Sequence, residues 1–269
     1  MGNFGYKHLT GLAWLGALIA ILLTALLLIR KKVSKKGGDV NAYDRAVIRY
    51  TAYFMWAWEI IKTIRLVNGA DFGAVGSYPF FMAPFHLCSM ALYAYLIVGS
   101  KRAGKLAEWL KPFSFAVMLL ATTLILAMPD GAGIMGNVNN WSFVYDNILP
   151  YQSFLYHGCL IFVPLYMVLS GFYIPKWVDI LKAVSVLIIT ACFAQAINFI
   201  FEGSNADFMM LRYGNGSPFV GLLHQTPALY YLVMGGASIA GTSVIISITI
   251  LINYIVSKIK NKKVVSKQQ

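Results

Sequence analysis

Long apolar stretches alternate with short polar segments along nearly the whole chain. About 20 apolar residues suffice to cross the ~30 Å hydrocarbon core of a bilayer as a helix. Seven candidate spans follow from this pattern, at 9–29, 46–66, 79–99, 113–128, 148–170, 180–201 and 228–256. The sequence therefore predicts an all-α, polytopic membrane protein in which residues 1–269 form one transmembrane domain, a seven-helix bundle.

Two of these stretches depart from the simple pattern. The fourth is short, and its helix could extend back through Lys111. The first, Leu9–Ile29, is too long for the apolar part of a signal peptide, and Arg30 follows it instead of a small-residue cleavage site. We therefore expect the first stretch to remain as a span.

The basic residues gather on alternate loops. Segments 30–45, 100–112, 171–182 and 258–269 hold 17 of the 22 lysines and arginines. Basic loops face the cytoplasm in most membrane proteins, so this pattern places the N-terminus outside and makes 258–269 a basic cytoplasmic tail at the C-terminus. We expect a multi-pass protein of a bacterial plasma membrane.

Composition narrows the class of protein further. The chain is 59% hydrophobic and 12% charged, which is far from a soluble domain. Its net charge of +12 lies at the ends of apolar stretches, where it suits anionic lipid, so we expect no nucleic-acid partner. The cysteines Cys88, Cys159 and Cys192 lack metal-type spacing, and no metal or cofactor is predicted.

Several polar residues fall at one depth within the predicted spans. If 79–99 is helical, Cys88 lies roughly 13 Å below its outer end, and His157 lies roughly 10 Å below the same face, at ~1.5 Å per residue. Glu59 and Asn198 occupy the same outer half. These positions allow one shared polar cavity, although the rotation of each helix is not fixed by the pattern.

Cys88 and His157 are the strongest candidates for catalytic residues. An imidazole that takes the proton of a thiol makes the sulfur a good nucleophile, and a buried histidine in lipid usually needs a specific partner. The alternative for Cys88 is a small apolar side chain at a helix interface, which is the commoner role of membrane cysteines.

Supporting roles can be assigned to other polar residues. Asn198 or His86 could donate to an oxyanion, although on a helix His86 points about 200° away from Cys88, which favours a structural role. Glu59 could orient a histidine or simply pair with Lys62. Arg212 could contact a lipid headgroup, the alternative being a solvated loop charge.

Three short motifs resemble those of the YwaF-type integral membrane protein family. They are Phe85-His86-Leu87-Cys88-Ser89-Met90, Tyr156-His157-Gly158-Cys159-Leu160, and the stretch from Asn198 to Met210. That family includes a eukaryotic acyltransferase that moves fatty acyl chains between phospholipids. The resemblance implies Cys88 as nucleophile and His157 as base.

Two functions are therefore compatible with the sequence. The first is a membrane acyltransferase that moves acyl chains between phospholipids and lysophospholipids through an acyl-Cys88 intermediate and without a cofactor. The second is a protein that binds or transports a small molecule without catalysis. The sequence does not indicate an oligomeric state.

Overall fold

The structure is a computed structural model that describes residues 6–68, 83–127, 149–202, 207–213 and 220–265. These residues form helices and turns, and no strand occurs among them. The elements in chain order are α1 (Tyr6–Lys35), α2 (Val40–Val67), α3 (Met90–Val98), η2 (Lys101–Ala103), α4 (Gly104–Pro112), η3 (Phe113–Val117), α5 (Met118–Ala127), α6 (Leu149–Leu169), α7 (Val178–Ile200), η6 (Phe208–Met210), α8 (Val220–Gln225) and α9 (Pro227–Val265).

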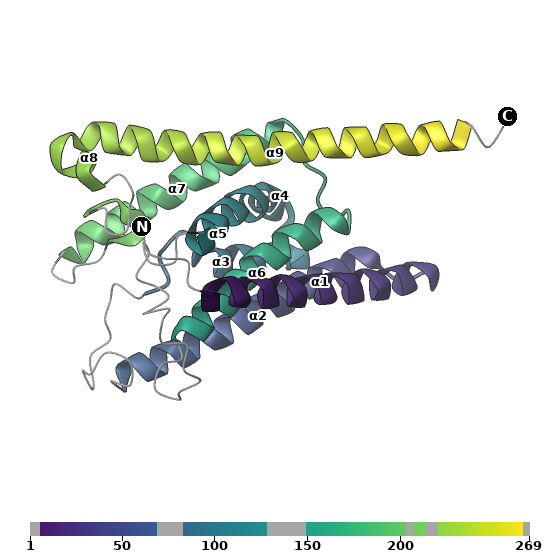
Figure 1. Ribbon diagram of the computed structural model, residues 1–269, viewed down its shortest axis with the longest axis horizontal. Helices are drawn as coiled ribbons and strands as arrows, with labels where there is room; N and C mark the ends of the chain where they lie inside the picture. The colour runs from purple at the N-terminus through teal and green to yellow at the C-terminus, as the bar shows by residue number, and fades with distance from the viewer. Residues whose placement is uncertain (1–5, 69–82, 128–148, 203–206, 214–219, 266–269) are drawn as a thin grey trace.

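The helices form two groups around a central layer. Helices α1, α2 and α6 lie together along the lower part of Figure 1, and each contacts the other two. Helix α9 runs along the upper side with α7, while α3, α4 and α5 lie between the two groups (Figure 1). The central layer buries its apolar side chains from both sides, and the main core therefore passes through α3, η3 and α6.

Five helices in the described part of the chain are long and apolar enough to cross a membrane. They are Thr10–Lys35, Lys101–Leu126, Gln152–Leu169, Val178–Ile200 and Pro227–Ile259. The prediction of an all-helical, polytopic protein is therefore confirmed at this level. The number of seven spans and the sides on which the termini lie stay predictions.

The predicted helix over 79–99 is wrong in its first half. Residues 83–89 form successive turns, and the helix α3 begins only at Met90. Pro84 provides a reason, because its ring fixes φ and it has no N–H to continue a helix. The part of the prediction at 79–82 lies outside the described residues. His86 and Cys88 are thus on turns, and neither their helical depth nor their 200° separation holds.

The fourth predicted span also differs from the structure. It was expected at 113–128, whereas helical structure begins at Lys101 and continues to Ala127. Pro112 lies within this long helix, and the next five residues, Phe113–Val117, form a π-helical turn. Proline removes one backbone donor from the helix, and π-turns are a common way to absorb such an interruption.

Helix α2 presents one continuous buried face to its neighbours. Its buried positions recur every three or four residues, at Asp44, Ile48, Ala52, Met55, Glu59, Lys62 and Leu66. This spacing is that of a helix with one inward face. Three of the seven positions are ionisable, so α2 carries charge into the interior at both of its ends.

Candidate functional site

The polar part of the candidate site begins with an ion pair on α2. The Nζ of Lys62 lies 2.6 Å from the Oε1 of Glu59, and both side chains are largely buried. The arrangement is a close ion contact and not an aligned hydrogen bond. The prediction that Glu59 pairs with Lys62 is confirmed, and the pair places a charged group inside the protein, where isolated charges are costly.

Cys88 lies next to this ion pair. The residue is partly exposed, and its thiol interacts electrostatically with both Lys62 and Glu59. The side chain of Ser89 interacts with the thiol and also with the hydroxyl of Tyr156. Tyr156 in turn donates to the backbone oxygen of Cys88 over 3.4 Å. Residues from α2, from the turns before α3 and from α6 thus meet around one sulfur atom.

His157 lies on α6, and among the described residues only one of its two ring nitrogens has a hydrogen-bond partner. Its side chain is 2% exposed. The Nδ1 lies 2.7 Å from the backbone oxygen of Ser153, so it carries the proton and donates it. The Nε2 is buried and has no hydrogen-bond partner among the described residues. The neutral tautomer set by Ser153 leaves a lone pair on Nε2, which is the form that accepts a proton.

The motif that contains Cys88 and the motif that contains His157 meet in the structure. The hydrogen bond between them is made by Tyr156 and not by His157. Within the described residues, no hydrogen bond joins the thiol of Cys88 to the imidazole of His157. Consecutive helix residues point about 100° apart, so the imidazole leaves α6 on the flank of the side that reaches Cys88. The roles of Cys88 and His157 stay predictions.

Asn198 supports the backbone of the segment after α7. It is fully buried, its Nδ2 donates to the oxygen of Phe208 over 3.1 Å, and its Oδ1 accepts from the N–H of Phe208 over 2.8 Å. A second contact of Nδ2 goes to Gln195 at 3.4 Å. The amide group is thus engaged on both sides, and the predicted oxyanion role would require it to release one of these bonds.

Arg212 and His86 also contact the segment that Asn198 holds. The guanidinium of Arg212 donates to the backbone oxygens of Asn198 and Glu202, and it pairs with the Glu202 carboxylate at 2.6 Å. The ring of His86 packs edge-on against Phe208, with 5.0 Å between the ring centroids. Both residues therefore help to close one end of the helix bundle, and lipid contact by Arg212 stays a prediction.

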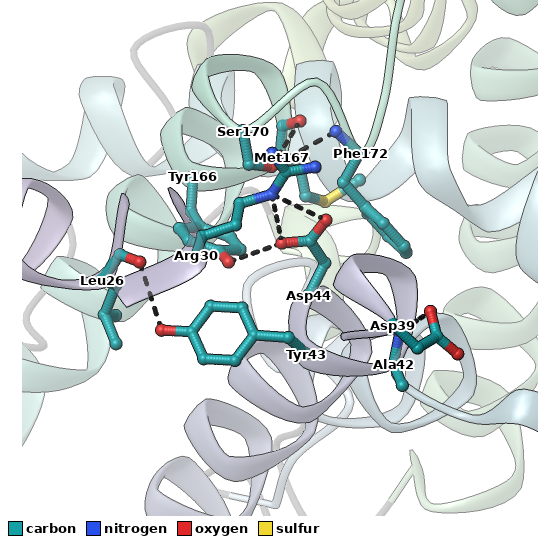
Figure 2. Close-up of polar contacts among 10 residues, drawn as sticks. All are labelled: Leu26, Arg30, Asp39, Ala42, Tyr43, Asp44, Tyr166, Met167, Ser170 and Phe172. Atoms are coloured by element: carbon teal, nitrogen blue, oxygen red, sulfur yellow. Dashed lines mark hydrogen bonds and ion pairs between the residues drawn. The ribbon is translucent and has the colours of Figure 1, made fainter. Parts of the chain in front are cut away.

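A second polar network, which the sequence pattern did not single out, lies at the opposite end of α2. The carboxylate of Asp44 is fully buried and accepts from the Nε of Arg30 at 2.9 and 3.1 Å and from the hydroxyl of Tyr166 at 2.7 Å. Figure 2 shows these three side chains converging. Asp44 is in phase with Glu59 and Lys62 on α2, and that periodicity was the signal available in the sequence.

Asp179 forms a similar network at the start of α7. Its carboxylate accepts from the hydroxyl of Tyr173, from the N–H of Lys176 and from the ammonium of Lys182. Burial raises the pKa of Tyr173, and the nearby carboxylate of Asp179 raises it further. The turn between α6 and α7 is thereby held by a carboxylate whose neighbours are all donors.

Comparisons with known proteins identify a family. The model of the TMEM164 family matches residues 3–254, nearly the whole chain. No curated protein and no solved structure matches it. The match and the apolar helices together support a multi-pass membrane protein, whereas the YwaF-type naming, the plasma membrane and a bacterial source stay predictions. The described residues contain no cluster of three or more metal-ligating side chains. The chain belongs to the TMEM164 family.

Proposed function

We propose that this protein transfers fatty acyl chains between phospholipids and lysophospholipids through a thioester on Cys88. The observation that carries the proposal is the state of His157. A buried imidazole whose Nδ1 donates to Ser153 and whose Nε2 has no partner is prepared to accept a proton. Such unsatisfied buried atoms are rare in proteins and call for an explanation.

The surroundings of Cys88 suit an attack on an ester carbonyl. Cys88 is partly exposed as a residue, so a lipid ester can approach this segment, and the buried sulfur itself becomes accessible when the bound lipid displaces its neighbours. The hydroxyls of Ser89 and Tyr156 lie beside it as donors, and the ammonium of Lys62 acts on it together with the paired carboxylate of Glu59. An oxyanion that forms on the carbonyl would be stabilised by such donors in a site with little water. In this proposal Tyr156 and Ser89 take the oxyanion role that the sequence pattern assigned to Asn198 or His86, and Tyr156 releases its 3.4 Å bond to the Cys88 backbone oxygen to do so.

The reaction balances without a cofactor. The sulfur of Cys88 bonds to the acyl carbon, the bond between that carbon and the glycerol oxygen breaks, and the thiol proton passes through Nε2 of His157 to the departing lysolipid. In the second half, the hydroxyl of an acceptor lysolipid gives its proton to His157 and attacks the thioester. The carbon–sulfur bond then breaks and the proton returns to the sulfur. This sequence requires His157 to approach Cys88 within hydrogen-bond distance when lipid binds.

The test is an acyl-exchange assay with the purified full chain in lipid nanodiscs. A phospholipid with a labelled acyl chain and an unlabelled lysolipid are supplied, and peptide mass spectrometry searches for an acyl adduct on Cys88. We expect the Cys88→Ala variant to lose transfer by about 10³-fold or more and His157→Gln to lose it by about 10²–10⁴-fold. Cys192→Ala is the matched control, because that cysteine is exposed and lies outside the three motifs.

Two results would contradict the proposal. One is the absence of an adduct on Cys88 together with unchanged transfer in the Cys88→Ala variant. The other is uptake of a small solute into proteoliposomes that does not depend on Cys88, which would favour a binding or transport protein.

A further inference from the structure

An apolar groove lies between α1, α2 and α6, away from Cys88. Its volume is about 650 Å³, which is within the usual range for ligand sites. It extends from Leu15 to Leu26 on α1 and from Tyr43 to Phe54 on α2, and its floor on α6 includes Gly158. Leu22, Tyr50 and other lining side chains remain exposed, so the groove is open along its side.

Two hydroxyls of the groove are already engaged within the protein. The hydroxyl of Tyr43 donates to the backbone oxygen of Leu26 over 3.1 Å, as Figure 2 shows. The hydroxyl of Thr51 donates to the backbone oxygen of Val47 over 2.9 Å. Because these groups are satisfied within the helices, the walls that they share with leucine and phenylalanine side chains suit a hydrocarbon chain and not a polar solute.

The length of the groove matches one leaflet of a bilayer. Leu15 and Leu26 are eleven positions apart on α1, which is roughly 16 Å at ~1.5 Å per residue. One leaflet contributes about half of the ~30 Å hydrocarbon core. A single acyl chain that entered at one membrane surface would therefore run along the whole groove.

One end of the groove lies beside a cluster of positive charge. Arg30 follows Leu26 by one helical turn, and its charge is balanced by Asp44 (Figure 2). Beyond it α1 ends in a cluster of exposed lysines, which consists of Lys31, Lys32, Lys35 and Lys36. A negatively charged headgroup at this end of the groove would meet these lysines at the membrane surface.

We propose that this groove binds one acyl chain of an anionic phospholipid, with the headgroup against the lysine cluster. The site is distinct from the one proposed for acyl transfer, because Cys88 does not line it. The bound lipid would fill the groove between the three helices, and the protein would bind preferentially in membranes rich in anionic lipid.

The experiment uses the full chain in phosphatidylcholine nanodiscs that contain a small share of phosphatidylglycerol with a photoreactive group on its acyl chain. After irradiation, peptide mass spectrometry locates the adducts. We expect them on 15–26 of α1 and 43–54 of α2. Ala46 lines the groove, and Ala46→Trp should lower labelling there about tenfold or more, because the indole occupies the space of the chain.

Matched variants separate the two parts of the site. Ala20→Trp is the control for bulk, since Ala20 is exposed on α1 and does not line the groove. The double variant Lys32→Gln/Lys36→Gln changes two exposed side chains that are turned closer to the groove than the other two lysines of the cluster, and it should reduce the preference for the anionic lipid over a photoreactive phosphatidylcholine by about fivefold per lysine. This variant keeps the test informative even if Ala46→Trp fails to fold.

Three outcomes would overturn the proposal. Unchanged labelling in a folded Ala46→Trp variant would show that the chain does not lie in the groove. Equal labelling by the two lipids, insensitive to the lysine substitutions, would remove the headgroup contact. A lower oligomeric mass of Ala46→Trp, with labelling unchanged, would show that a second copy of this chain fills the groove. None of these readouts depends on acyl transfer, so they separate this proposal from that of an acyltransferase.

Discussion

Both ends of α2 carry buried charged side chains, but the two ends differ in how fully these charges are hydrogen-bonded. At the first end, the carboxylate of Asp44 is surrounded by donors from Arg30 and Tyr166. Toward the second end, Glu59 and Lys62 form a close ion contact, and on the neighbouring helix α6 the Nε2 of His157 has no hydrogen-bond partner in the described part of the chain. Asp44, Glu59 and His157 are all buried, with at most 4% exposed, so burial does not account for the difference.

The comparison indicates how to separate structural from functional polar groups in this membrane protein. A buried group whose bonding capacity is used by its neighbours stabilises one arrangement of helices, as Asp44 does between α1, α2 and α6. A buried group left with an unused lone pair gains nothing for stability and is costly to maintain. Several buried groups of the described residues lack a partner, Tyr95 among them, but the imidazole of His157 is one that readily accepts a proton. A reaction therefore explains the retention of His157 better than stability does, which is our reason for placing the chemistry there.

The strongest test of this comparison is the replacement of Asp44 by alanine. The guanidinium of Arg30 and the hydroxyl of Tyr166 would then lose the group that satisfies them. Removal of one partner of a buried ion pair typically costs about 3–5 kcal/mol, and we expect a loss of this size in the free energy of unfolding. Reversible unfolding in mixed detergent micelles measures it.

The control for this variant is Glu108→Gln, which breaks the ion pair of Glu108 with Lys111. Because the Glu108 carboxylate is mostly exposed, this substitution should cost no more than about 1 kcal/mol. If the two variants lost equal stability, the network around Asp44 would not hold the helices in the way that we infer.

The next largest effect is expected from Tyr166→Phe, which removes a single hydroxyl. That hydroxyl donates to the Asp44 carboxylate over 2.7 Å, and the side chain is fully buried. Hydrogen bonds to charged groups contribute about 1.5–3 kcal/mol, so the unfolding free energy should fall by that amount. A change close to zero would mean that Arg30 alone satisfies the carboxylate.

The sequence predicted the all-helical membrane fold better than it predicted the difference between the two ends of α2. Apolar stretches indicate segments buried in lipid, and basic loops indicate the cytoplasmic side. Both signals can be read from local composition without knowledge of tertiary contacts. The turn at 83–89 was missed because the apolar pattern continues through it, although Pro84 was a signal against an unbroken helix. Asp44 was missed because its role depends on Arg30 and Tyr166, which are far from it in sequence and meet it only after folding.

Only some contacts of the candidate site could be predicted from the sequence. The Glu59–Lys62 pair follows from i, i+3 spacing on one helix. The meeting of Cys88 with Tyr156 could not be derived, because depth along a helix says nothing of rotation about its axis. For the same reason, the sequence pattern placed Asn198 in the polar layer and gave no indication that it bonds to Phe208.

Asn198 offers a third test, of intermediate size. Asn198→Ala removes two hydrogen bonds to the backbone of Phe208 and leaves those backbone groups without their side-chain partner. We expect a loss of about 1–3 kcal/mol in the free energy of unfolding, with faster hydrogen exchange at 207–213. Gln195→Ala, which removes only a contact of 3.4 Å, is the matched control and should change exchange little. Equal effects of the two variants would contradict this role of Asn198.

The smallest effect is expected from Tyr95→Phe. This variant is the most discriminating test, because it repeats the Tyr166→Phe substitution at a position where the hydroxyl has no hydrogen-bond partner among the described residues. Tyr95 is fully buried on α3, and its hydroxyl makes no hydrogen bond among the described residues. Removal of an unsatisfied buried group should leave the free energy of unfolding unchanged or raise it by up to about 1 kcal/mol. The same unfolding measurement compares Tyr95→Phe directly with Tyr166→Phe. If Tyr95→Phe lost as much stability as Tyr166→Phe, the absence of a hydrogen bond would not identify groups that contribute nothing to stability, and the argument for His157 would lose its physical basis.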